Sequence, residues 1–137
     1  MEQETDITRL LQRSRIIAVV GCSPKPERDS HRVSKYLQDA GFRVIPINPG
    51  ANEILGVKAY PDLASIPPEI DIDIVDVFRA PEHIPAVVDA VLERGAKALW
   101  LQLGCANPGA EQRARNAGLE VVSDLCIKIE HRNRLDS

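Results

Sequence analysis

Residues 16–40 read IIAVVGCSPKPERDSHRVSKYLQDA, and this stretch decides the fold. Its first five residues form a continuous apolar run that is too short for a free-standing helix. The run is rich in β-branched side chains, which predicts a strand buried on both faces, as in a parallel sheet. Gly21 ends the run, and a residue without Cβ allows a sharp turn and a close approach of backbone N–H groups to an anion. The stretch therefore predicts a strand-loop-helix unit that cradles a phosphate.

The second half of the same stretch predicts an amphipathic helix. Ser30 is expected to be its N-cap, because a serine hydroxyl can accept a hydrogen bond from the first turn. Gly41 stands where a left-handed C-terminal cap is expected. Between these two residues, apolar side chains recur at i, i+3, i+4 and i+7, namely Val33, Tyr36, Leu37 and Ala40. The helix should therefore bury one face against the sheet.

Downstream, apolar runs alternate with amphipathic stretches. Further strands are expected at residues 42–47, 58–60, 70–78, 98–103 and 119–122, and further helices at 5–13, 84–92 and 108–117. Asp71 and Asp73 are expected on the solvent side of the 70–78 strand, and residues 128–134 are expected to form a flexible tail. The alternation requires right-handed crossovers. It predicts an α/β three-layer sandwich, with a mostly parallel sheet of five to six strands and helices on both faces.

The chain length, the net charge and the amino-acid composition narrow the class of protein. A chain of 137 residues suits one domain, residues 1–137, with a helix in 1–14 and a C-terminal segment at 124–137. The net charge of −3, with two Phe, two Tyr and one Trp, argues against nucleic-acid binding. No apolar run reaches the roughly 18 residues that cross a membrane, and the polar N-terminus does not resemble a signal peptide. We therefore expect a cytoplasmic protein without membrane association, and three widely separated cysteines indicate neither disulfides nor zinc.

Ligands of parallel sheets bind at the carboxyl ends of the strands, where the strand order reverses. In this sequence those ends are residues 21–24, 48–49, 78–81 and 102–107. They carry polar side chains that a turn alone does not require: Ser23, Asn48, Arg79 and Gln102. We expect these four turns to meet at one crevice that holds a small-molecule nucleotide.

The first turn differs from that of dinucleotide dehydrogenases. Ser23 and Pro26 replace the second and third glycines of the G-x-G-x-x-G motif. Asn48 stands where such enzymes place an acid against the ribose, and residues 48–53 contain no Arg or Lys for a 2′-phosphate. Coenzyme A, with its pyrophosphate and 3′-phosphate, fits these residues better than NAD or NADP.

The motifs GCSPKPERDSHRV, VIPINP, AYPDLASIP, DIVDVFRAPE, GAKALWLQLG, AGLEVVSD and CIKIEH occur in this order over residues 16–131. As a set they resemble the small coenzyme A-binding proteins, whose Rossmann-like fold is similar to the nucleotide domain of the succinyl-CoA synthetase α-subunit. The resemblance implies a phosphate-facing loop at Gly21, Cys22, Ser23 and Pro24, and helix-opening contacts from Arg28 and Ser30. It also implies adenosine-side turns at Asn48, Pro49, Phe78, Arg79 and Pro81. Two departures are Cys22, where the family has Ala or Val, and Leu125, where it commonly has Arg.

The expected role is binding of coenzyme A or an acyl-CoA by a stand-alone domain with no catalytic residue and no metal site. Backbone N–H groups of residues 21–23, with Ser23, Ser30 and Arg28, would hold the pyrophosphate, and Arg79 would pair with a phosphate. Gln102 and Gly104 would border the path of the pantetheine arm. Cys22 is expected to be a small loop residue rather than a nucleophile or a disulfide partner of the coenzyme. His31, His83 and His131 are expected to be solvated.

Three alternatives remain open from the sequence. The first is an oxidoreductase that uses NAD or NADP. The second is a partner or regulatory subunit of a separate acyl-CoA ligase or acyltransferase, with an unidentified protein partner. The third is a structural module whose crevice stays empty.

Overall fold

A parallel sheet forms the centre of the molecule, as the computed structural model shows for residues 5–135. The outer ends of the two predicted terminal segments, residues 1–4 and 136–137, lie outside the described residues. Within residues 5–135 the sheet has the strand order β2-β1-β5-β6-β7. These strands are β1 (Ile16–Val20), β2 (Arg43–Ile47), β5 (Ile74–Val77), β6 (Ala98–Leu101) and β7 (Glu120–Ser123). The chain leaves β1 toward β2 and later returns to β5 on its other side, so the strand order reverses at β1.

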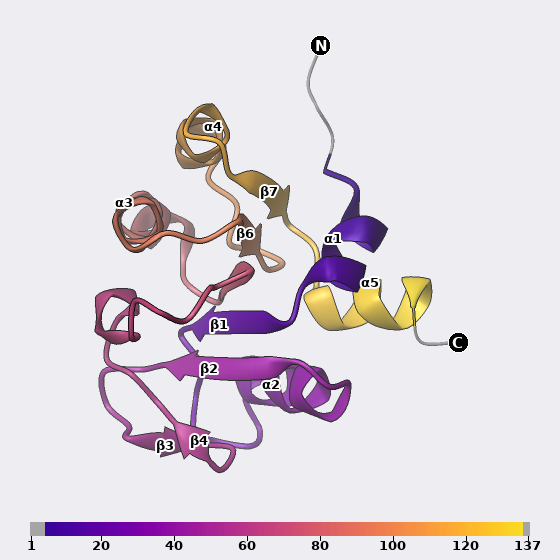
Figure 1. Cartoon of the computed structure of the whole chain (residues 1–137), viewed down its shortest axis with the longest axis vertical. Helices are drawn as coiled ribbons and strands as arrows, with labels where there is room; N and C mark the ends of the chain where they lie inside the picture. The colour runs from indigo at the N-terminus through magenta and orange to yellow at the C-terminus, as the bar shows by residue number, and fades with distance from the viewer. Residues whose placement is uncertain (1–4, 136–137) are drawn as a thin grey trace.

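Helices cover both faces of this sheet (Figure 1). One layer contains α1 (Ile7–Arg13), α2 (Asp29–Asp39) and α5 (Ile127–Arg134), and the other contains α3 (Ile84–Arg94) and α4 (Pro108–Asn116). Short elements complete the described chain: the antiparallel pair β3 (Glu53–Ile54) and β4 (Val57–Lys58), and the 3₁₀ turns η1 (Leu63–Ser65) and η2 (Pro81–His83). The predicted three-layer α/β fold is therefore confirmed, with five strands in the parallel sheet. No helix among the described residues has the length and apolar character needed to cross a bilayer.

The prediction for Asp73 was wrong. Asp71 is exposed as expected, but only 9% of Asp73 is exposed. Its carboxylate accepts hydrogen bonds from the N–H groups of Arg15 (2.8 Å) and Ile16 (3.0 Å) and lies 3.2 Å from Lys97 Nζ. The regular strand begins only at Ile74, so Asp73 is free to satisfy the two N–H groups where β1 starts. Burial by itself raises the pKa of Asp73, but these hydrogen bonds and Lys97 outweigh it and hold the pKa below its usual value.

Replacing Asp73 with Asn should lower the free energy of unfolding by about 1–3 kcal/mol at pH 7, because charge-assisted hydrogen bonds to two backbone N–H groups are lost. The native pKa lies below that of the unfolded chain. The stabilisation is therefore complete above the unfolded pKa of about 3.9 and is lost as the pH falls through the native pKa. Urea unfolding at a series of pH values measures this difference. Asp71→Asn is the matched control, and an equal loss in both variants would contradict the assignment.

The prediction of a flexible tail at residues 128–134 was also wrong, because this segment forms α5. Ile127 at its start is fully buried, and the Ile127 N–H donates to Gln102 Oε1 at 3.1 Å. Trp100 Nε1 donates to Leu125 O at 2.8 Å, and Tyr36 Oη lies 2.8 Å from His131 Nδ1. These partners come from β6 and α2, far away in the sequence. Tertiary contacts therefore order a helix whose own apolar pattern is weak.

Candidate functional site

Three adjoining pockets follow the carboxyl edge of the sheet. The β2–α3 pocket, of about 260 Å³, is lined by Gly21, Pro49, Pro61, Leu63, Arg79 and Val87, among others. The loop pocket, of about 620 Å³, is lined by Gly21, Ser23, Lys25, Arg28, Ser30 and Phe78, together with Glu27, Asp29 and Arg32. The α2–α5 pocket, of about 380 Å³, has Arg32, Phe78, Gln102, Cys126, Lys128 and Arg132 among its lining residues. Gly21 is shared by the first two pockets, and Phe78 is among the residues shared by the last two, so the three pockets lie side by side; together they are called the groove.

Gly21 lines two of these pockets. Its φ is +82°, and a Cβ placed on it would lie 2.3 Å from the carbonyl oxygen of Phe78. The same Cβ would lie 3.5 Å from Arg79 Cδ, so Arg79 extends over the turn. The turn therefore needs a glycine for two reasons, the left-handed backbone and the close approach of the chain after β5.

The first turn of the loop does not offer its N–H groups to a ligand in the way the sequence suggested. The N–H groups of Gly21 and Cys22 both donate to Ile47 O, at 3.1 and 3.3 Å. The Ser23 N–H donates to Ser30 Oγ at 2.9 Å. All three donors are thus satisfied within the chain. The predicted contact of these groups with a pyrophosphate stays a prediction, and it would require that these internal hydrogen bonds open.

Ser30 is also not the N-cap of α2. The helix begins at Asp29 with Arg28 in the cap position, and no side chain caps it. Ser30 Oγ instead accepts from Ser23, and His31 Nδ1 lies 2.9 Å from Ser23 O, so the first turn of α2 ties the loop to the helix. His31, expected to be solvated, therefore has a structural partner.

The uncapped start of α2 faces the loop pocket. Within the described residues, the N–H groups of Asp29 and Ser30 have no hydrogen-bond acceptor. Arg28 and Asp29, at this helix end, both line the loop pocket, and Lys25 lies in the preceding loop. Free N–H groups at a helix N-terminus attract anions because the helix dipole is positive there. The loop pocket can therefore bind a phosphate group through α2 rather than through residues 21–23.

Two other predicted residues, Asn48 and Cys22, make contacts within the chain near the groove. Asn48 Nδ2 donates to Cys22 O at 2.9 Å, and Asn48 Oδ1 accepts from the Gly50 N–H at 2.7 Å, so both ends of this side chain brace the turns. Cys22 is fully buried, with Sγ 3.4 Å from Ser34 Oγ. Burial raises the pKa of the Cys22 thiol. A buried, protonated thiol fits the interpretation as a small loop residue and opposes that of a nucleophile.

The remaining predicted residues divide between the groove and its surroundings. Pro49, Phe78 and Arg79 line it, and Gln102 lines the α2–α5 pocket while also accepting from Ile127 N–H. Gly104 donates its N–H to Asp124 Oδ1 at 2.9 Å, and Pro81 O accepts from Asn107 Nδ2 at 2.9 Å. Neither Gly104 nor Pro81, nor Pro24 in the loop, is among the residues that line the three pockets.

Sequence reasoning missed the cations on the helix layer. Lys25 and Arg32 line the loop pocket, and Lys128 and Arg132 line the α2–α5 pocket. Lys128 and Arg132 are four residues apart, a spacing that places two side chains on one face of a helix. That signal is visible in the sequence, but it has meaning only once residues 127–134 are known to be helical.

Comparison with known proteins agrees with this geometry. A family model described as CoA binding domain matches residues 15–132. The protein YneT of Bacillus subtilis (strain 168) is 48% identical over 128 residues, which cover 93% of this chain and 93% of that protein. A solved structure of a hypothetical protein from Pyrococcus horikoshii OT3 has a TM-score of 0.90 and 39% identity, over 98% of this chain and 99% of that one.

Two larger enzymes contain a similar region. The α subunit of acetate–CoA ligase (ADP-forming) II from Pyrococcus furiosus is 29% identical over 124 residues, which cover 82% of this chain and 27% of the subunit. The apo structure of dinucleotide-forming acetyl-coenzyme A synthetase 1 from Ca. Korarchaeum cryptofilum has a TM-score of 0.70 and 26% identity, over 85% of this chain and 27% of the enzyme. The chain thus spans about a quarter of each of these ligases. Because the family model matches residues 15–132 and solved structures share the fold, this protein belongs to the CoA binding domain family.

Proposed function

We propose that the chain binds coenzyme A or an acyl-CoA along the groove and does not itself catalyse a reaction. The observation that carries this proposal is that three chemically different pockets adjoin one another, with Gly21 and Phe78 as shared lining residues. Coenzyme A likewise joins an adenine ring, a pyrophosphate and a pantetheine arm in one molecule. The order of the pockets suits the order of these groups in the coenzyme.

Each pocket suits one part of the ligand. The β2–α3 pocket combines Pro49, Pro61 and Leu63 with the exposed Arg79, which suits an adenine ring and a nearby phosphate. The loop pocket combines the free start of α2 with Lys25 and Arg28, which suits a pyrophosphate. The α2–α5 pocket is the third pocket and would hold the pantetheine arm. Gln102, which the sequence analysis expects beside the path of this arm, lines this pocket.

Titration calorimetry with coenzyme A, NADH and NADPH tests the proposal. Coenzyme A should bind, and both nicotinamide cofactors should bind at least tenfold more weakly, since a single charge-assisted hydrogen bond that the wrong ligand cannot form has about that effect. Arg28→Gln should weaken coenzyme A binding about tenfold, because a cation beside the helix terminus is removed. Arg9→Gln on α1 removes an equal charge outside the groove and should change nothing. Tight NADPH binding without coenzyme A binding would support the oxidoreductase alternative instead.

A second candidate is a partner of a separate acyl-CoA ligase or acyltransferase. It is favoured by two exposed aliphatic side chains that line the α2–α5 pocket, Leu103 at 60% and Ile129 at 38% exposure. Co-purification from native lysate should then recover an acyl-CoA ligase or acyltransferase subunit with the wild-type chain and lose it with Leu103→Ser. Recovery of the chain alone would contradict this role.

A further inference from the structure

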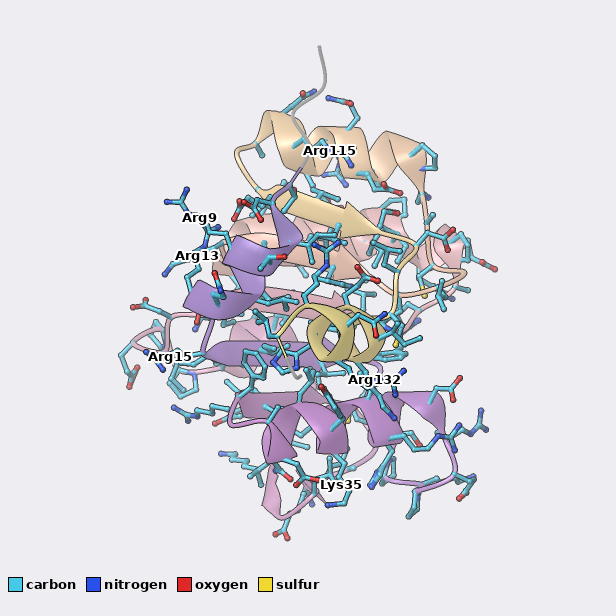
Figure 2. The ribbon with its side chains drawn as sticks, turned by 90° about the vertical axis from the view of Figure 1, so that its right-hand side faces the viewer. Arg9, Arg13, Arg15, Lys35, Arg115 and Arg132 are labelled. Atoms are coloured by element: carbon cyan, nitrogen blue, oxygen red, sulfur yellow. The ribbon has the colours of Figure 1, made fainter. Side chains whose placement is uncertain are left out.

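The α2–α5 pocket has a cationic wall. Lys128 and Arg132 line it from α5, and Arg32 lines it from α2 on the other side. Figure 2 shows Arg132 where α5 and α2 come together, away from Arg9, Arg13 and Arg15 at the opposite end of the strands. Phe78, Val33, Leu103 and Ile129 supply apolar surface between these charges. The pocket therefore combines apolar surface with positive charge.

Within residues 5–135, much of this positive charge is not neutralised. Arg32 pairs with Asp29, the one carboxylate that lines the pocket, and also donates to Glu27 O. Lys128 Nζ lies 5.8 Å from the centre of the Tyr36 ring and, like Arg132, forms no ion pair with a described residue. The chain as a whole carries a net charge of −3. A pocket with three cations and one acid is thus a local reversal of sign that favours an anionic ligand group.

The order of the groove identifies which part of a ligand reaches this pocket. The α2–α5 pocket adjoins the loop pocket, on the side away from the β2–α3 pocket. With adenosine in the β2–α3 pocket and pyrophosphate in the loop pocket, the ribose 3′-phosphate stays on the adenosine side. The thiol end of the pantetheine arm, with its acyl group, then enters the α2–α5 pocket. In this orientation, a ligand anion that pairs with Lys128 and Arg132 would belong to the acyl group.

We infer that the α2–α5 pocket selects acyl-CoA ligands whose acyl chain ends in a carboxylate, with Lys128 and Arg132 as the anion-binding residues. This inference rests on the proposed binding of coenzyme A. The apolar lining residues accommodate the methylene groups of the acyl chain, and Lys128 and Arg132 pair with the carboxylate.

Titration calorimetry with succinyl-CoA and butyryl-CoA tests the inference, because these two ligands have four-carbon acyl chains and differ in the terminal carboxylate. Wild-type protein should bind succinyl-CoA about tenfold more tightly than butyryl-CoA. The double variant Lys128→Gln, Arg132→Gln should lose this preference and bind butyryl-CoA as the wild type does. The double variant Arg9→Gln, Arg15→Gln is the charge-matched control: it removes two exposed cations that line none of the three pockets and should keep the preference. Thermal unfolding of each variant confirms that it is folded.

Other outcomes overturn the inference and show where it fails. Equal wild-type affinity for succinyl-CoA and butyryl-CoA would show that the pocket does not recognise the terminal carboxylate. The proposed binding of coenzyme A would stand in that case. If the double variant weakens free coenzyme A and butyryl-CoA alike but leaves dephospho-CoA unaffected, the cations hold the 3′-phosphate instead. Absence of binding by free coenzyme A, succinyl-CoA and butyryl-CoA would overturn the proposed function as well.

Discussion

Replacing Gly21 with Ala is expected to lower the free energy of unfolding by about 3 kcal/mol or more and to abolish coenzyme A binding. The added Cβ would lie 2.3 Å from Phe78 O, which is backbone and cannot rotate away. The φ of +82° adds a left-handed strain of roughly 1–2 kcal/mol for any residue with a side chain. Since Gly21 joins the β2–α3 and loop pockets, displacement of this turn separates the two parts of the groove. Chemical denaturation and calorimetry with coenzyme A measure the two effects.

Gly56 provides a matched control for this experiment. Its φ of +74° is close to that of Gly21, but a Cβ placed on it would meet no atom within 4 Å. Gly56→Ala should therefore suffer only the left-handed strain and keep ligand binding. If Gly21→Ala and Gly56→Ala lose the same stability, the close approach to Phe78 is not what demands a glycine at position 21.

Replacing Asp76 with Asn is expected to stabilise the protein at pH 7 by roughly 1–3 kcal/mol. Asp76 lies in the middle of β5, between Val19 of β1 and Trp100 of β6, and is fully buried. Neither carboxyl oxygen has a hydrogen-bond partner among the described residues. Burial raises the pKa of Asp76 well above its usual value, so the folded state holds a proton at pH values where the unfolded chain has already released it. Asparagine has nearly the same shape and does not titrate, so folding requires no uptake of a proton at this position.

The raised pKa of Asp76 also determines how the stability of the wild type changes with pH. Because the native pKa of Asp76 is raised, wild-type stability falls as the pH rises from the unfolded value of about 3.9 through the native pKa, and levels off above it. An asparagine side chain at this position does not titrate, so the gap between the Asp76→Asn variant and the wild type should open over this window and close toward pH 4. Denaturant unfolding across pH 4–8 measures the gap. A variant that is less stable than the wild type at pH 7 would show that the carboxyl group has a stabilising partner in solution.

Most of the fold follows from local patterns in the sequence. The apolar run at residues 16–20 and the helical spacing at 33–40 are signals within one element, and parallel strands carry their ligand loops to a common edge by topology alone. The sequence therefore located the groove at Gly21, Pro49 and Arg79, which line it. The choice among nucleotides rests on the residues at these turns and on the family.

What the sequence by itself determined was the layered α/β fold, the position of the glycine turn and the edge of the sheet where the pockets lie, because each depends on short-range periodicity and backbone sterics. Only the tertiary structure decided how polar groups pair over long distances. Asp73 binds the start of β1, Ser30 holds Ser23 rather than capping its helix, and Gln102 meets the start of α5. These pairings depend on register and burial, which bring together groups that local sequence patterns do not connect. The cationic wall of the α2–α5 pocket exists for the same reason, since Lys128 and Arg132 share a face only after distant partners make α5 a helix.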